Sequence, residues 1–307
     1  MDYCTHSLTQ PVLRITSCKF EHDPPVQIIE TGGRADVLCG ILGIIRKKVA
    51  VKAFRRIDRN LEDLVIENEI KIWRLLGNHP HIASFIGIAP VNDYHPKYLA
   101  EGAVSDYCAH GDLKTYLYKS DEDVVNHQTR FELLLGVIQG LAYIHEQSVV
   151  HGDLKAHNIL VDGDGKVARI CDFGSSSIEC GCYSGPHEQE GTVPWDSPEL
   201  WMEEDEPLRT HQSDIWAYGC VALEVQMGLM PWDPFNERNG RAMKFRQYEA
   251  QTGPPAKVSD PNLNLGMHPI KQRVWDLMVR CWSADPQQRP SAAELLAEML
   301  SISPVSV

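Results

Sequence analysis

One short polar segment of the chain has the residue types and spacing that phosphoryl transfer requires. It reads His151-Gly-Asp-Leu-Lys-Ala-His-Asn158, and Asp172-Phe-Gly174 follows fourteen residues later. A carboxylate can orient an attacking hydroxyl and accept its proton, and a lysine can steady the moving phosphoryl group. An amide and a second carboxylate can hold a metal ion that neutralises phosphate charge. Any one of these residues could be ordinary loop polarity, but their occurrence together in this order predicts a phosphoryl-transfer site.

The residues of this segment can be given separate roles. We expect Asp153 to be the catalytic base and Lys155 to contact the transferring phosphate. We expect Asn158 and Asp172 to bind Mg²⁺, a hard ion that prefers oxygen ligands and is commonly shared between carboxylates and substrate phosphates. His151 follows an apolar run, so we interpret it as a packed structural histidine rather than a general base.

A strand must bring a cation to the same place. Residues 48–54 alternate in character, which predicts a strand with Ala50 and Lys52 on one face. A lysine at a strand end is usually solvated, but the small neighbour Ala50 would leave room for a flat ligand. We therefore expect Lys52 to reach a phosphate.

A helix over about 60–76 must supply the carboxylate that aims this lysine. Glu69 shares a helix face with apolar residues, whereas Glu67 shares its face with charged residues and should meet water. The pattern predicts an ion pair between Lys52 and Glu69.

The chain changes character once along its length. Residues 1–27 have no sustained period and are interpreted as an extension. A β-rich stretch then continues to about 105–109, and amphipathic or apolar helical patterns follow. The predicted helical segments are 131–142, 213–227, 271–281 and 291–300.

Two further features are interpreted as architectural. Asp214 lies at the start of an apolar helix, where its carboxylate could accept backbone N–H groups of the catalytic loop or of its own first turn. Glu199 and Arg289 could form a buried ion pair between distant segments.

The net charge, the cysteine pattern and the lack of long apolar stretches argue against several classes of protein. A formal net charge of −13 over 307 residues argues against nucleic acid or an anionic membrane as partner. The nine cysteines are scattered without paired CxxC motifs, which argues against a zinc site or a disulfide framework. No signal peptide or apolar stretch of membrane-spanning length is present, so we expect the cytosol or the nucleus.

Together these motifs resemble a eukaryotic protein kinase over roughly residues 28–300. The resemblance rests on Val-Ala-Val-Lys52, Glu69, the His151–Asn158 and Asp172–Gly174 segments, Gly-Thr-Val-Pro-Trp-Asp-Ser-Pro-Glu199, Asp-Ile-Trp-Ala-Tyr-Gly219 and Arg289. The sequences from Gly191 to Glu199 and from Cys281 to Pro290 resemble the tyrosine-kinase-like branch, most of which phosphorylates Ser or Thr. Lys155 supports the same hydroxyl preference.

The resemblance implies an α+β bilobal fold, with a small antiparallel sheet lobe carrying one helix and a larger, mainly helical lobe. Its boundaries would be an N-lobe at 28–105, a hinge at 106–110, a C-lobe at 111–300 and a tail at 301–307. The cofactors would be ATP and Mg²⁺, and the partner a protein substrate with Ser or Thr. The resemblance gives the nucleotide-contacting residues as Gly32, Gly33, Val37, Ala50, Lys52, Ser105 as gatekeeper, Asp106, Tyr107, Cys108, Asp112 near the ribose, Lys155 and Leu160. It also implies an internal stack of Trp73, Phe85, His151 and Phe173.

Three departures from the family pattern stand out. Gly152 replaces an arginine that in many kinases grips a phosphate on the activation segment, so we predict no dependence on that phosphorylation. The glycine-rich lid is degenerate, with Glu30 and Ala35 in glycine places and Arg34 in an aromatic one. We expect an anion at Glu30 to weaken nucleotide binding and Arg34 to offset part of this effect by meeting phosphate. Ser197 for alanine is a mild change.

Two alternatives stay open at this point. The chain could be a pseudokinase or scaffold with weak or no catalysis because of the degenerate lid. It could also be a small-molecule phosphotransferase, although such chains lack the Glu199 segment and the Asp214–Gly219 helix. The protein substrate, the pathway and the oligomeric state are not readable from the sequence.

Overall fold

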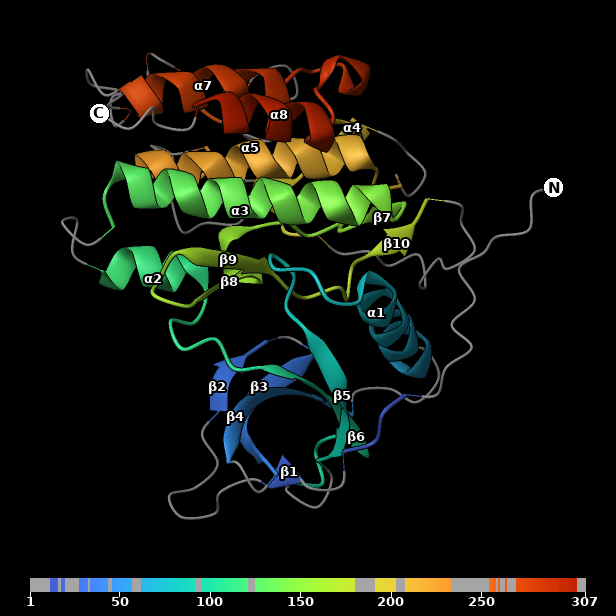
Figure 1. Ribbon diagram of the computed structural model, residues 1–307. Coiled ribbons are helices and arrows are strands. Elements are labelled where there is room, and N and C mark those ends of the chain that lie inside the picture. Colours follow the sequence, from blue (N-terminus) through green and yellow to red (C-terminus); the bar gives the residue numbers. More distant parts are fainter. Residues whose placement is uncertain are drawn as a thin grey trace.

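The protein has two lobes, a β-sheet lobe with one helix and a larger helical lobe (Figure 1). This is the predicted bilobal fold. The computed structural model describes residues 12–15, 18–19, 28–32, 34–43, 46–56, 62–91, 95–120, 125–179, 191–202, 208–232, 254–257, 259, 263 and 269–302. Within these ranges no helix combines the length and the apolar character needed to cross a bilayer.

The N-terminal lobe is an antiparallel sheet in the order β1-β3-β4-β6-β5, with β2 paired to β3. Its strands are β1 (Cys18–Lys19), β2 (Ile28–Thr31), β3 (Ala35–Leu42), β4 (Lys47–Phe54), β5 (Phe85–Pro90) and β6 (Glu101–Asp106). Part of the expected 1–27 extension is thus built into the sheet, since β1 pairs with β3. The N–H of Ile15 also donates to the carbonyl of Ile88 in β5, whose own N–H donates to the carbonyl of Leu13.

Alternation along β4 decides which side chains enter the core. Val49, Val51 and Ala53 are fully buried on one face, while Ala50 and Lys52 are half-buried on the other. The predicted strand therefore has the expected faces. Strand β5 begins at Phe85, and Ile82 just before it forms a bridge to Ile170 of the other lobe.

Helix α1 (Glu62–Leu76) is the single helix of the described N-lobe and lies against the C-lobe at its C-terminal end. The Tyr143 hydroxyl donates to the carbonyl of Leu76 at 2.7 Å, and the indole N–H of Trp73 donates to the carbonyl of Ala83 at 2.6 Å. The first bond ties the helix that carries Glu69 to the C-lobe, and the second ties it to the segment before β5, where the N–H of Ala83 in turn donates to the carbonyl of Ile170.

The C-terminal lobe is built around a buried helix. Helix α5 (His211–Met227) has every residue from Ser213 to Gln226 buried, and it contacts α3 and α7. The other elements are α2 (Leu113–Lys119), α3 (His127–Glu146), α4 (Glu199–Met202), α7 (Pro269–Cys281), α8 (Ala292–Ile302), the 3-10 turns η1 (Ala156–Asn158), η2 (Val193–Trp195) and η3 (Pro286–Gln288), and the short strand pairs β7 (Val149–Val150) with β10 (Ser177–Ile178) and β8 (Ile159–Asp162) with β9 (Val167–Ile170).

The C-lobe helices extend beyond the predicted segments: α3 spans His127–Glu146 rather than 131–142, and α7 begins at Pro269 rather than at 271. Helix α5 begins at His211 rather than Ser213, because Thr210 and Ser213 form a capping box whose side chains satisfy each other's backbone N–H. Asp214 is therefore inside the first turn. Helix α8 continues to Ile302, so residues 301 and 302 belong to it rather than to the expected tail.

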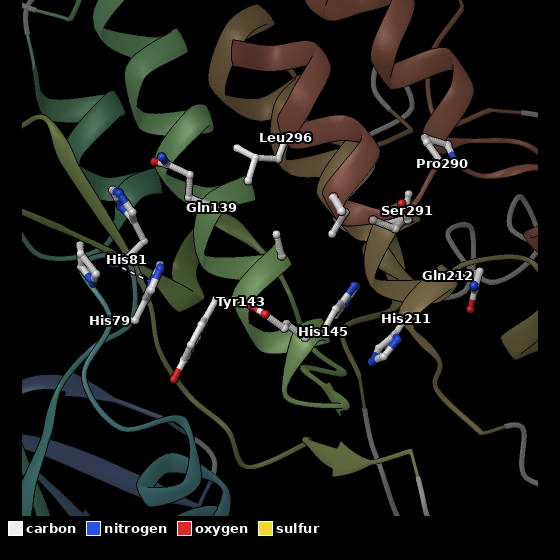
Figure 2. A pocket seen from close by; sticks show the side chains of 16 residues that line it. His79, His81, Gln139, Tyr143, His145, His211, Gln212, Pro290, Ser291 and Leu296 are labelled. Carbon is white, nitrogen blue, oxygen red and sulfur yellow. Dashed lines mark hydrogen bonds between the residues drawn. The ribbon is translucent and has the colours of Figure 1, made fainter.

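A cavity of about 790 Å³ lies between the loop before β5 and helices α3, α5 and α8 (Figure 2). Four histidines are among its walls: His79, His81, His145 and His211. The rings of His145 and His211 stack with centroids 4.0 Å apart, and His145 Nε2 lies 3.0 Å from Asp214. This wall of the cavity thus contacts the carboxylate of Asp214, which also accepts the backbone N–H groups of His151 and Gly152.

Candidate active site

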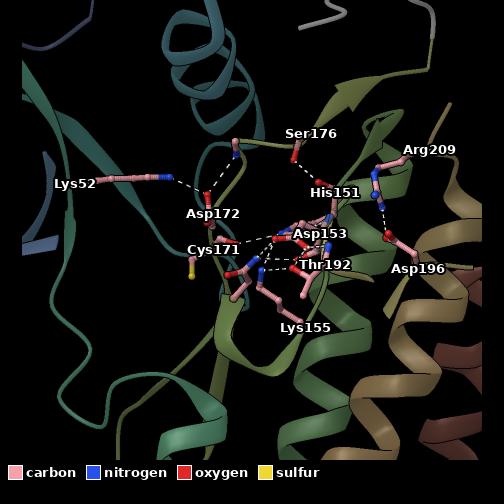
Figure 3. A network of polar contacts seen from close by, with 12 residues as sticks. Lys52, His151, Asp153, Lys155, Cys171, Asp172, Ser176, Thr192, Asp196 and Arg209 are labelled. Carbon is pink, nitrogen blue, oxygen red and sulfur yellow. Dashed lines mark hydrogen bonds and ion pairs between the residues drawn. The ribbon is translucent and has the colours of Figure 1, made fainter. Parts of the chain in front are cut away.

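The predicted cation lies between two carboxylates at the interface of the lobes. Lys52 Nζ donates to Glu69 Oε1 at 2.6 Å and to Asp172 Oδ1 at 2.8 Å. Glu69 is 3% exposed, while Glu67 lies at the surface and pairs with Lys71. The predicted ion pair between Lys52 and Glu69 is confirmed, and so is the choice of Glu69 over Glu67. Figure 3 shows Lys52 reaching from β4 across to Asp172.

The charges of this group stabilise each other. Burial alone would lower the pKa of Lys52, but Asp172 and Glu69 outweigh it, and the pKa is raised. The Lys52 cation lowers the pKa of Asp172 to about 2, against the opposing effect of burial. Lys52 therefore stays charged and Asp172 stays ionised at neutral pH. Asp172 has a φ of 65°, an uncommon conformation for a residue with a side chain, which aims its carboxylate at Lys52.

Asp214, which is 2% exposed, holds the backbone of the catalytic loop, residues 151–158. Its carboxylate accepts the backbone N–H groups of His151 at 2.8 Å and Gly152 at 2.9 Å. Of the two roles considered for Asp214, the structure shows the contact to the catalytic loop. Gly152 has a φ of 82°, and a Cβ there would overlap the carbonyl oxygen of Ser175. A residue with a side chain would strain the loop at this point.

Asp153 and Lys155 face each other beyond this support. Lys155 Nζ donates to Asp153 Oδ2 at 2.6 Å and to the Thr192 hydroxyl at 2.5 Å. Thr192 in turn donates its backbone N–H and its hydroxyl to Asp153 Oδ1, at 3.0 and 2.8 Å. No role in the site was predicted for Thr192 from the sequence. Its position after Gly191, within a motif that the resemblance rests on, could have indicated that it belongs to the site.

Asn158 and Asp172 offer oxygen atoms that suit a magnesium ion. The amide nitrogen of Asn158 donates to the carbonyl and to Oδ2 of Asp153, at 2.8 and 3.0 Å. Because the nitrogen is engaged there, the carbonyl oxygen of the amide is left to face a ligand. Asp172 supplies an ionised carboxylate, the other donor that Mg²⁺ prefers. The residues present thus fit the ion.

The residues expected around a nucleotide base come from strands that lie side by side. In the sheet register Val37 pairs with Lys52 and Ala50 pairs with Ser105, and a bridge joins Asp112 to Leu160 of the C-lobe. The apolar side chains of this group, Val37, Ala50 and Leu160, are all half-buried. Ser105 is 6% exposed.

The connection after β6 follows directly. Asp106 ends β6, and its side chain contacts Lys47 and Ser84, so its backbone rather than its carboxylate is left for a ligand. Tyr107 lies under the Lys48 ammonium group, and burial raises the pKa of the Cys108 thiol to about 12. Asp112 caps α2 by accepting the N–H of Thr115.

The lid over this region is only partly described. Gly32 donates its N–H to the carbonyl of Ala35 in the turn between β2 and β3, whereas Gly33 lies outside the described residues. Desolvation, followed by the negative charges of Asp112 and Asp172, raises the pKa of Glu30. Glu30 is therefore within electrostatic reach of the Asp172 carboxylate.

An aromatic stack crosses the two lobes behind the site. Ring centroids are 5.5 Å apart for Trp73 and Phe85, 6.1 Å for Trp73 and Phe173, and 5.5 Å for His151 and Phe173. His151 is fully buried, and its Nε2 lies 3.1 Å from the carbonyl oxygen of Cys171. The interpretation of His151 as a packed structural histidine is confirmed.

The segment after Thr192 is fixed by an ion pair between buried Arg289 and half-buried Glu199. Arg289 makes two parallel bonds to Glu199, each 2.7 Å, and donates to the carbonyl groups of Ser283 and Gln212. The predicted pair is therefore confirmed. It joins the start of α4 to the segment before α8.

Comparison with known families matches the family described as "Protein kinase domain" over residues 25–300. Mitogen-activated protein kinase kinase kinase A of Dictyostelium discoideum is 27% identical over 279 residues, covering 88% of this chain and 27% of that protein. Serine/threonine-protein kinase BCK1/SLK1/SSP31 of Saccharomyces cerevisiae is 31% identical over 73% of this chain and 14% of that protein. Serine/threonine/tyrosine-protein kinase HT1 of Arabidopsis thaliana is 30% identical over 71% of this chain and 50% of that protein.

The chain thus spans half or less of the length of these relatives. The family match covers nearly all of it, and the relatives agree with the tyrosine-kinase-like character predicted from the motifs. The chain belongs to the protein kinase family, within its tyrosine-kinase-like group.

Proposed function

We propose that the protein is an ATP-dependent serine/threonine protein kinase. The observation that supports this best is the joint placement of Lys52, Glu69 and Asp172 on one side and Asp153, Lys155 and Thr192 on the other. The first group suits the phosphates of a nucleotide, and the second suits a substrate hydroxyl.

The substrate hydroxyl oxygen attacks the γ-phosphorus of ATP, and the bond to the bridging oxygen breaks, so that ADP leaves with the electron pair. Asp153 orients the hydroxyl and receives its proton late in the transfer. Lys155, beside it, balances the charge of the transferring group. Lys52, held by Glu69, contacts the nucleotide phosphates. Asn158 and Asp172 would hold Mg²⁺, which would supply positive charge to neutralise phosphate oxygens.

The preference for Ser or Thr is supported by Lys155 and by the names of two relatives. One relative is named serine/threonine-protein kinase, and another is named serine/threonine/tyrosine-protein kinase. We propose a kinase domain at 28–300 with a hinge at 106–110. We also propose a protein rather than a nucleic acid as partner, given the net charge of −13. The scattered thiols, such as Cys220 and Cys281, support the cytosol or the nucleus.

Radiolabelled ATP and phosphoamino-acid analysis test this proposal. We expect phosphoserine or phosphothreonine with wild-type protein and a loss of about 100-fold or more for Asp153→Asn. Asp164→Asn, the same change on the exposed turn between β8 and β9, is the matched control and should keep full activity. MgADP should raise the melting temperature of all three proteins.

The binding-module alternative predicts a different pattern. In a scaffold, MgADP would still stabilise the wild-type protein, but no acceptor would become labelled. Labelling that persists in Asp153→Asn would also contradict the proposed role of this carboxylate.

A further inference from the structure

A second charged pair, to which the proposed mechanism gives no role, lies beside the catalytic loop. Arg209, in the segment before α5, donates from Nη1 to Asp196 Oδ1 at 2.7 Å. Both side chains are 10% exposed. Figure 3 shows the pair next to His151, Asp153 and Thr192. A nearly buried ion pair is expensive to desolvate, so its presence at this position calls for a role.

The path of the Arg209 side chain gives that role. A Cβ placed on Gly191 would overlap its guanidinium group, and a Cβ placed on Gly152 would lie 3.3 Å from its Cδ. Arg209 therefore packs against two glycines that lack side chains where it passes. Gly152 directly precedes Asp153, and Gly191 directly precedes Thr192. The side chain thus spans the two backbone segments whose next residues exchange the hydrogen bonds of the site.

Asp196 fixes the other end of the same segment. It follows η2, and its N–H donates to the carbonyl of Val193. Asp153 and Lys155 are within electrostatic reach of its carboxylate. Arg209 is thereby bound to the segment at Asp196 and packed on it at Gly191, on both sides of Thr192.

We propose that Arg209 and Asp196 are positioning residues for phosphoryl transfer. Resting on the proposed kinase activity, the inference is that this internal ion pair holds Gly191 and Thr192 against the catalytic loop, so that Thr192 keeps its two hydrogen bonds to Asp153. Lys52, Glu69 and Asp172 form a separate group of ion pairs, so nucleotide binding should not depend on Arg209 and Asp196.

Three variants separate this role from general stability. Asp196→Asn keeps the shape and removes the charge, Arg209→Met removes the guanidinium, and Arg209→Lys keeps a cation. The matched control is Arg280→Met, which breaks the exposed pair of Arg280 with Glu298 on α7 and α8. Each protein is assayed for kcat and KM with ATP, using myelin basic protein as acceptor, and for its melting temperature with and without MgADP.

We expect Asp196→Asn and Arg209→Met to lose about 10- to 100-fold in kcat, the range expected when catalytic groups are misplaced. Their KM for ATP and their stabilisation by MgADP should stay within about twofold of wild type. Arg209→Lys should recover part of kcat, and Arg280→Met should match wild type. A kcat within twofold of wild type in both charge-removing variants would overturn the inference. So would a parallel loss of MgADP stabilisation, because the pair would then be merely structural.

Hydrogen exchange of the peptide that contains Thr192 tests the inference without catalysis. Its N–H is bonded to Asp153, so Asp196→Asn should accelerate its exchange at least several-fold, while peptides from α8 stay unchanged. If wild-type protein labels no acceptor, the proposed function fails, and this measurement still decides the inference. Unchanged exchange would reject it. If Arg209→Met does not fold, the isosteric Asp196→Asn variant carries both measurements.

Discussion

Replacing Glu224 by glutamine should change how the stability of the protein depends on pH. Glu224 lies on the buried helix α5 and is 7% exposed. Its Oε2 accepts the indole N–H of Trp195 at 2.8 Å, whereas its Oε1 has no hydrogen-bond partner among the described residues. Burial raises the pKa of this carboxyl group from 4.5 to about 7, against the opposing hydrogen bond from Trp195.

The sign and size of the effect follow from this pKa. Between pH 4.5 and about 7 the unfolded chain loses the proton of Glu224 while the folded protein keeps it. Stability therefore falls as the pH rises through this window, and the full cost is reached above pH 7. A rise of the pKa from 4.5 to about 7 corresponds to about 3 kcal/mol. Glutamine stays neutral and can still accept from Trp195, so the variant escapes this loss.

Urea unfolding from pH 5 to pH 8 measures the effect. The free energy of unfolding of Glu224→Gln, minus that of wild type, should increase by about 2–3 kcal/mol across this range. A constant offset does not matter, because only the slope reports the titration. Glu199→Gln is the matched control: burial opposes ionisation of Glu199, but its bonds from Arg289 prevail and lower its pKa. The deficit of this control should be nearly constant from pH 5 to 8. A Glu224→Gln difference that does not vary with pH would refute the reasoning.

Three further predictions concern the lid, the activation segment and the buried pair. Glu30→Gly should lower the KM for ATP several-fold in steady-state assays, because it removes an anion near the expected position of the ATP phosphates. An unchanged KM would contradict this. Phosphatase treatment of the purified protein should leave kcat within twofold, since Gly152 supplies no phosphate-binding side chain. A larger change would overturn this expectation. Arg289→Met should lower the free energy of unfolding by about 3–5 kcal/mol in urea titrations, because it leaves the Glu199 carboxylate without its cationic partner. A loss below about 1 kcal/mol would count against a stabilising pair.

Periodicity predicted the parts of the site that local geometry decides. Glu69 and Lys52 could be paired from the sequence because a strand alternates with period 2 and a helix repeats every 3.6 residues, so each side chain has one possible face. The bilobal fold followed from the resemblance to protein kinases, and the role of His151 followed from the apolar run before it.

Contacts between distant segments could not be predicted in the same way. Thr192 lies 39 residues after Asp153, and local periodicity does not specify that its hydroxyl turns to that carboxylate. The pair of Arg209 with Asp196 was not anticipated, because it depends on the space left by two glycines. The start of α5 was misplaced by two residues because its N-cap is Thr210 rather than the more prominent Asp214.

Helix α5 has no face toward water between Ser213 and Gln226. A substitution there meets close-packed neighbours in every direction, so a change in size would have to be matched by a second change nearby. Sequence drift in this protein should therefore collect on the outer helices α7 and α8, while α5 admits few alternatives. New substrate preferences would then arise from altered surface segments over an interior that stays the same.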